Sequence, residues 1–193
     1  ADVHNLFIPN DIVFYNLIYA PTGVETPNYK ESLLVLNNRN VVIKNNFYHN
    51  NGMLTGNYDL QGNLFVGDNA DGGTGQLFFK TSTDQFYHST SGKGLTTHIN
   101  VDKTSGELKP AVDTKVLAIS FLSILNGGFT APSDSLVIRG IHDSDTLLVY
   151  SGGVFNHNNG TVNITPYSAA WYADVHYLDI PNSIVLYNLV YEP

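Results

Sequence analysis

The chain has 193 residues, a formal net charge of −8 at pH 7, and only 13% charged residues against 42% hydrophobic ones. The acidic balance and the lack of a dense Lys/Arg cluster exclude a nucleic-acid-binding surface, which needs a basic face. With no cysteine, disulfides and thiol chemistry are excluded, and with no run of about 18 apolar residues no membrane-spanning helix is expected.

Short apolar stretches separated by turn residues run through the whole chain. They are rich in Val, Ile, Leu, Tyr and Phe, whereas Asn, Asp, Gly and Pro lie between them, a pattern typical of strands joined by tight turns. In chain order we predict strands at Ile12–Tyr19, Ser32–Leu36, Val41–Lys44, Leu54–Leu60, Leu64–Val66, Gln76–Phe79, His98–Val101, Lys115–Ile119, Leu122–Leu125, Leu136–Arg139, Leu147–Tyr150, Thr161–Ile164 and Ser183–Val190. No stretch has a convincing helical period, so residues 1–193 are predicted to form a single all-β module.

The two ends of the chain repeat one another. Residues 1–21 read ADVHNLFIPNDIVFYNLIYAP and residues 173–193 read ADVHYLDIPNSIVLYNLVYEP, so that 15 of 21 positions are identical at an offset of 172 residues. A fixed period indicates an array of modules. We therefore interpret the two terminal segments as equivalent repeat copies that form junctions between modules.

A finer repetition lies inside the 172-residue period. Phe47–Gly52 (FYHNNG) matches Phe155–Gly160 (FNHNNG), and Gly-Gly corners recur at Gly127 and Gly152. Similar strand-turn units about 20–30 residues apart fit the coils of a β-solenoid, or parallel β-helix. An alternative architecture is a β-sandwich that is completed by a donated terminal strand.

These motifs resemble the repeats of large bacterial secreted and surface proteins of the parallel β-helix type. The resemblance is carried by the corner VFNHNNGTVNI at 154–164, the strand VLYNL at 185–189 with its copy FYNL at 14–17, and the segments 100–108 and 128–136. The resemblance implies an extracellular β-helical rod of the adhesin kind. It carries over no catalytic residue.

No constellation of residues predicts catalysis. Nucleophile-elbow, phosphate-loop and dinucleotide motifs are absent, and the four glutamates are widely scattered, so no enzyme, metal or cofactor site is expected. The residues that we expect to matter are apolar positions of the terminal copies, which would pack the junction between modules. These are Ile8, Ile12, Val13, Tyr15 and Leu17 with their copies Ile180, Ile184, Val185, Tyr187 and Leu189.

Several polar features have a simple structural interpretation beside a functional one. His49 and His157 each precede Asn-Asn-Gly, which suggests that they stabilise a turn, although periodic histidines can also bind metal. The segment Gly67–Gly75 fits a Gly-rich turn better than a calcium loop, because its oxygen ligands have the wrong spacing. Glycosylation at the sequons of Asn159 and Asn163 stays open.

The sequence therefore predicts a structural, non-enzymatic module of an extracellular fibre, adhesin or surface layer, or of a virion fibre. Its partners would be copies of itself or tandem modules of the same chain, joined head to tail through the terminal repeats. The alternative is a carbohydrate-binding or carbohydrate-cleaving β-helix, such as a phage tailspike, for which the abundant aromatic residues would provide stacking surfaces. A cluster of acidic and aromatic side chains along one groove would favour that alternative.

Overall fold

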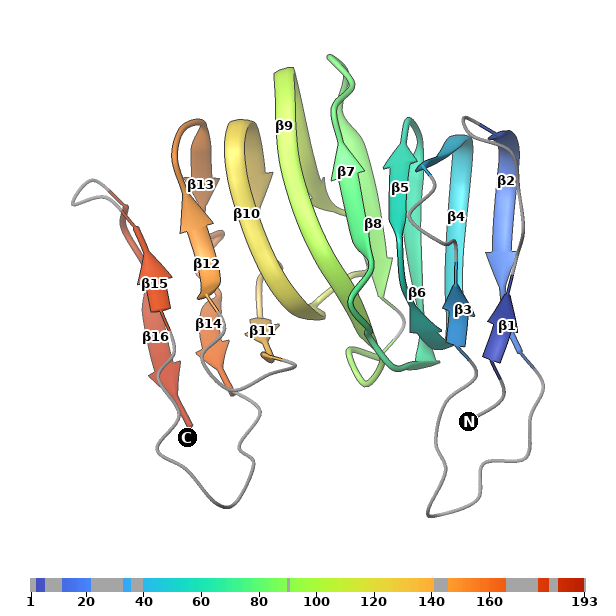
Figure 1. Cartoon of the computed structure of the whole chain (residues 1–193). Helices are drawn as coiled ribbons and strands as arrows, with labels where there is room; N and C mark the ends of the chain where they lie inside the picture. The colour runs from blue at the N-terminus through green and yellow to red at the C-terminus, as the bar shows by residue number, and fades with distance from the viewer. Residues whose placement is uncertain are drawn as a thin grey trace.

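A computed structural model describes residues 3–5, 12–21, 33–35, 40–89, 91–140, 146–165, 177–180 and 184–192, and within these the chain is all-β with no helix. The strands lie side by side from the N-terminal end of the molecule to the C-terminal end (Figure 1). They are β1 (Val3–Asn5), β2 (Ile12–Tyr19), β3 (Leu33–Val35), β4 (Asn40–Leu54), β5 (Asn57–Leu60), β6 (Asn63–Ala70), β7 (Gln76–Phe79), β8 (Gln85–Ser89), β9 (Leu95–Pro110), β10 (Val116–Thr130), β11 (Ser135–Ile138), β12 (Thr146–Tyr150), β13 (Val154–Asn156), β14 (Thr161–Ile164), β15 (Tyr177–Asp179) and β16 (Asn188–Tyr191).

Every strand pair in the described part is parallel, and the partners are stacked in continuous columns. One column of direct partners crosses the whole molecule through Ile12, Val41, Tyr58, Leu77, Ile99, Leu122, Leu148 and Leu178. Its members from Val41 to Leu148 are at most 1% exposed. The core is therefore a row of apolar side chains that each strand extends by one residue.

Three long strands, β4, β9 and β10, each pair with two or three short strands at successive points along their length. The first part of β4 pairs with β5 and its second part with β6, while β9 likewise receives β7 and β8. The pairing thus closes a ring of parallel strands in the order β4, β5, β7, β9, β8 and β6. The buried apolar side chains of these strands belong to one continuous hydrophobic cluster.

Register shifts in the long strands coincide with Asn/Gly clusters that the sequence suggested were turns between strands. They occur between His49 and Asn51 in the pairing of β4 with β6, and between Ile124 and Gly128 in the pairing of β10 with β9. A bulge of this kind inserts an extra residue, bends the strand and preserves the pairing on either side. The expectation that these clusters end strands was therefore wrong.

The short strands agree best with the sequence. β2, β7 and β14 have the predicted bounds, and β5, β7, β11 and β14 all alternate half-buried and buried residues as expected of strands with one face inward. The single strand predicted at Leu54–Leu60 is instead the end of β4, a turn at Thr55 and Gly56, and β5. The strand predicted at Ser183–Val190 is present only in its last part, as β16 at Asn188–Tyr191; residues 184–187 are not strand, and residue 183 lies outside the described residues.

Candidate functional site

Exposed apolar side chains gather at the two ends of the stack of strands. Twelve large hydrophobic side chains are exposed in the described part, and nine of them belong to β2, β15 or residues 184–191. A side chain on the last strand of a parallel stack has a neighbour on one side only, so it stays exposed unless something covers it. The nine are Val13, Tyr15, Ile18, Leu178, Val185, Tyr187, Leu189, Val190 and Tyr191.

The predicted junction residues fall on these end strands and split into two groups. Val13, Tyr15, Val185, Tyr187 and Leu189 are exposed, whereas Ile12, Leu17, Ile180 and Ile184 are half-buried; Ile8 lies outside the described residues. Half-buried and exposed positions alternate over residues 12–15 and over their copies 184–187, whereas residues 188–191 are all exposed. The terminal repeat marks both groups alike, and only the structure separates the exposed positions from the half-buried ones.

The two terminal copies have the same inward and outward pattern, but their second halves differ in exposure. Ile12, Phe14 and their copies Ile184 and Leu186 are all half-buried. In contrast, Tyr19 is 8% exposed whereas its copy Tyr191 is 55% exposed. The cause is the neighbouring strand: β4 covers β2 from the C-terminal side, while β16 is paired only with β14, on its N-terminal side.

An asparagine ladder ties β2 to the following strands. The side-chain oxygen Oδ1 of Asn16 accepts hydrogen bonds from Asn45 Nδ2 and from the backbone N–H of Asn46, both at 3.0 Å. Asn46 Oδ1 accepts a bond from Asn63 Nδ2 at 3.4 Å, and Asn63 Oδ1 accepts one from the N–H of Phe86 at 2.9 Å. The copy of Asn16 is Asn188, which is exposed.

Both histidines of the repeated FxHNNG motif bond to their own corner, as predicted, but in different ways. His49 is fully buried, with Nε2 2.7 Å from Gly52 O and Nδ1 3.2 Å from Thr96 Oγ1, and burial lowers its pKa to about 4. His157 Nδ1 instead accepts a bond from the N–H of Asn159 in an open turn, where Asn159 has a φ of 58°. The His157 ring stacks on Tyr187 at 5.6 Å.

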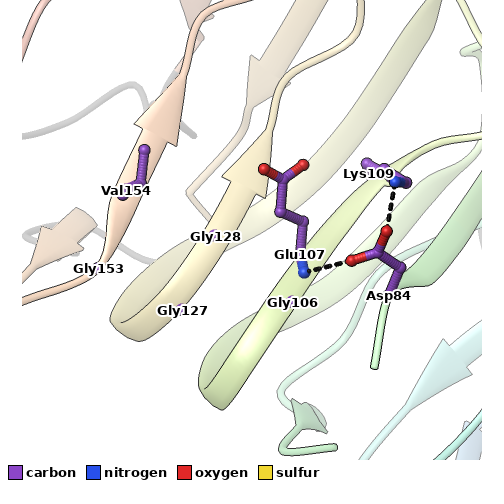
Figure 2. A pocket seen from close by; sticks show the side chains of 8 residues that line it. All are labelled: Asp84, Gly106, Glu107, Lys109, Gly127, Gly128, Gly153 and Val154. Atoms are coloured by element: carbon purple, nitrogen blue, oxygen red, sulfur yellow. Dashed lines mark hydrogen bonds and ion pairs between the residues drawn. The ribbon is translucent and has the colours of Figure 1, made fainter. Parts of the chain in front are cut away.

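A second candidate site is an open groove on the outer surface, which the sequence analysis did not find. It has a volume of about 510 Å³ and is lined by Asp84, Gly106, Glu107, Lys109, Gly127, Gly128, Gly153 and Val154. Figure 2 shows the three charged side chains together on one side and the glycines along the floor. A Cβ added to Gly127 would lie 2.6 Å from the Lys103 Cβ, at a φ of +77°, so side chains are excluded from this part of the floor.

The charged side chains of the groove hold one another in place. Lys109 Nζ donates to Asp84 Oδ2 at 2.5 Å, and the backbone N–H of Glu107 donates to Asp84 Oδ1 at 3.0 Å. Lys109 and this N–H both lower the pKa of Asp84, so this carboxyl stays ionised and is a poor general acid. Thr130 Oγ1 donates to Glu107 Oε2 at 3.2 Å, and Lys109 lies over the half-exposed Phe86 ring at 5.4 Å. The arrangement suits binding of a polar ligand better than bond cleavage.

Behind the groove, a lysine lies in the core. Lys103 is 1% exposed, and its Nζ donates to Gln85 Oε1 at 2.6 Å and to Thr81 Oγ1 at 3.0 Å. Burial lowers its pKa to about 8, against an opposing effect of the Asp84 charge. Gln85 Nε2 in turn donates to Leu60 O at 2.9 Å and Gly62 O at 2.6 Å. These bonds satisfy polar groups that burial would otherwise destabilise.

The remaining polar features give no site in the described part of the chain. No three His, Asp or Glu side chains gather there in a way that could hold a metal ion. Of the two sequons, Asn159 is exposed, whereas Asn163 is half-buried and donates to Glu192 Oε2 at 3.4 Å. No helix among the described residues is long and apolar enough to cross a membrane.

Comparison with known proteins adds no relative. No family model, no curated protein and no solved structure matches the chain.

Proposed function

We propose that the chain is a β-solenoid module whose function is structural, and that it forms rods by stacking end to end with further copies. The parallel ladders and the apolar column from Ile12 to Leu178 support stacked coils. A β-sandwich is built from antiparallel strands, so the described ladders do not favour that alternative. The ring of six strands fits a solenoid, because β4 and β9 close it by bending around coil corners.

One observation carries the proposal: the same strand occurs at both ends with opposite neighbours. β2 is covered by β4 from its C-terminal side, and residues 188–191 are covered by β14 from their N-terminal side. If one copy of this repeated strand pairs with β14 on one side and with β4 of the next module on the other, the two modules form one continuous stack. The column Leu117, Leu136, Val162 and Leu189 then continues as Leu17, Phe47, Leu64 and Tyr87, since Leu189 is the copy of Leu17.

Such a rod suits an extracellular fibre, adhesin or surface layer, with a virion fibre as the alternative location. The support is the resemblance of the repeated motifs to secreted β-helical proteins. Assembly through the two complementary ends is a structural function and needs no catalytic residues. A copy of the module is accordingly the partner that we propose.

A two-copy chain tests the proposal. Residues 1–193 are followed directly by a second copy of residues 22–193, and the length of the product is measured by small-angle X-ray scattering. We expect one straight rod that is roughly 35–45 Å longer than the single chain, since parallel neighbours are about 4.8 Å apart and a period holds about seven to nine coils. Two bodies that move independently would contradict the proposal.

Two matched pairs of substitutions in the two-copy chain test whether the junction strand holds the rod together. Leu189→Asp with Tyr191→Asp introduces charges at inward positions of the junction strand and should separate the rod into two bodies. Val185→Asp with Tyr187→Asp changes outward positions, which are 66% and 59% exposed, and should leave the rod intact. Equal effects of both pairs would show that inward packing does not form the junction.

The groove supports a second candidate function, the binding of a carbohydrate. Glu107, Lys109 and Asp84 offer hydrogen-bond partners for hydroxyl groups, and the half-exposed Phe86 offers an apolar surface beside them. We expect the chain to be retained on an oligosaccharide array and Glu107→Ala to weaken retention by about tenfold or more. Asp134→Ala, which changes an exposed acid away from the groove, is the control. An array without signal, or equal loss in the control, would contradict this function.

A further inference from the structure

The strand β2 is held on β4 by a specific set of contacts. Besides the two bonds from Asn45 and Asn46 to Asn16, the Tyr19 ring lies 6.3 Å from the His49 ring, and Ile18 is the direct partner of Tyr48. Burial at this interface raises the pKa of Tyr19 to about 12. A strand that pairs with this edge of β4 must therefore offer side chains that make the same contacts.

The C-terminal copy carries the same side chains in the same order. Asn188, Leu189, Val190 and Tyr191 stand where β2 has Asn16, Leu17, Ile18 and Tyr19, and only the change from Ile18 to Val190 alters a residue. The four residues are all exposed, Tyr191 by 55% against 8% for Tyr19. Their side toward the N-terminus already pairs with β14, and no other strand of the described residues pairs with them on the opposite side.

We infer that residues 184–191 take the place of β2 on the β4 strand of a following copy, so that one strand is shared by two modules. The inference rests on the proposed function and adds the partner surface and its register. In that register Asn188 accepts the bonds from Asn45 and Asn46 of the following copy, and Tyr191 packs against its His49. A one-residue slip would turn these side chains to the wrong face, so the register is strongly specified.

The number of strand pairs before and after the exchange shows when this contact can form between separate molecules. If residues 184–191 of one molecule displace β2 of another, one ladder is lost and one equivalent ladder is gained. The exchange gains no pairing and association costs translational freedom, so intact chains stay monomeric. β2 therefore competes with the C-terminal strand of a neighbour, and its release from β4 is what permits polymerisation.

The experiment uses the full chain with Leu17→Asp and Tyr19→Asp, which place charges at the inward positions that hold β2 on β4. We expect the unsubstituted chain to elute as a monomer in size exclusion with light scattering, and the variant to form concentration-dependent polymers. Val13→Asp with Tyr15→Asp, at positions that are 54% and 71% exposed, is the control and should stay monomeric. Circular dichroism checks that each variant keeps its strands.

Cysteine pairs then read the register, because the chain has no cysteine of its own. In the polymerising variant, Val190→Cys and Tyr48→Cys should form a disulfide between molecules, since Ile18 and Tyr48 are direct partners. Parallel neighbours are about 4.8 Å apart, within the span of a disulfide. Val190→Cys with Phe65→Cys should not link, because Phe65 lies one strand beyond Tyr48, roughly 10 Å away.

The outcomes separate this inference from the proposed function. Polymers linked through positions 190 and 48 support it. Polymers that link instead through Val190→Cys and Ile18→Cys would show strand-on-strand stacking, which overturns the shared strand but not the array. A folded variant that stays monomeric would also overturn it. If the variant unfolds, the pair Val190→Cys and Tyr48→Cys is tested in the two-copy chain instead. A disulfide between the two copies supports the inference, and a missing disulfide overturns it. Only failure of the two-copy chain to form one rod overturns the array.

Discussion

A Gly62→Ala variant is expected to lose at least about 3 kcal/mol of folding free energy. A Cβ at this position would lie 1.3 Å from the Asn45 carbonyl oxygen and 2.2 Å from its carbon, so a backbone segment has to move. The strand β6 begins at the next residue, and the Gly62 carbonyl accepts the bond from Gln85 at 2.6 Å. A shift of this corner therefore disturbs the Asn ladder and the buried polar network together.

The measurement is the urea midpoint of unfolding, followed by circular dichroism. Thr104→Ala is the matched control, because Thr104 is exposed and lies within β9. We expect the control to unfold close to the unsubstituted chain and Gly62→Ala to unfold at a much lower urea concentration or to be unfolded in its absence. Equal midpoints for the two variants would contradict the close approach of the chain at Gly62.

Acid is expected to destabilise the fold through His49. The Gly52 carbonyl can only accept, so Nε2 of His49 carries the proton and Nδ1 accepts from the Thr96 hydroxyl. Protonation would place a charge in the core and would require the Thr96 hydroxyl to turn from donor to acceptor. Because burial lowers the pKa to about 4 from an unfolded value of about 6.5, the unfolded chain binds more protons between these values. Stability is thus retained above about pH 6.5 and falls by about 3 kcal/mol as the pH drops to about 4.

The check is the unfolding free energy at pH 7 and pH 4.5 for the unsubstituted chain and for His49→Gln. Glutamine cannot titrate, so the variant should lose less stability between the two pH values, although it is less stable at pH 7. His157→Gln is the control and should keep the full acid sensitivity, because His49 is intact. The same loss in His49→Gln as in the unsubstituted chain would show that carboxyl groups alone cause the acid effect.

The short strands could be predicted from the sequence because their signal is local. β14 alternates polar and apolar residues between turn residues, and β7 is a short apolar run bounded by turn residues. The long strands could not be predicted, because an Asn-Gly cluster permits either a turn or a bulge. At Asn126–Gly128 a bulge forms because β10 stays paired with β9 on both sides of the cluster. The β9 partners lie about 23 residues earlier, so the local sequence does not reveal this pairing.

The buried polar side chains could not be predicted from the local sequence, because their hydrogen-bond partners lie far away in the chain. The strand β8 was not predicted because it begins with Gln85, whose inward side chain is acceptable only through the carbonyls of Leu60 and Gly62 and the amine of Lys103. Lys103 itself lies in the polar segment DKTSGE, which reads as an exposed turn. Only the stacking of neighbouring strands brings these groups together.

The groove could have been found from one sequence signal. Asp84-Gln85-Phe86 and Glu107-Leu108-Lys109 are separated by 23 residues, the distance between the bonded Asp84 and Glu107. Once such an offset is recognised as the spacing of strand partners, the two acids and Lys109 are placed on one face. The residues that we propose for the junction are marked in the sequence by the terminal repeat itself.

Hydrogen exchange of residues 188–191 tests the shared strand most directly. In the single chain these residues pair on one side, and amides at an open edge should exchange rapidly. In the two-copy chain the same residues should be flanked by β14 on one side and by β4 of the second copy on the other. We expect their exchange, measured by mass spectrometry, to slow by on the order of 100-fold. Equal exchange rates in the single and two-copy chains would contradict the account.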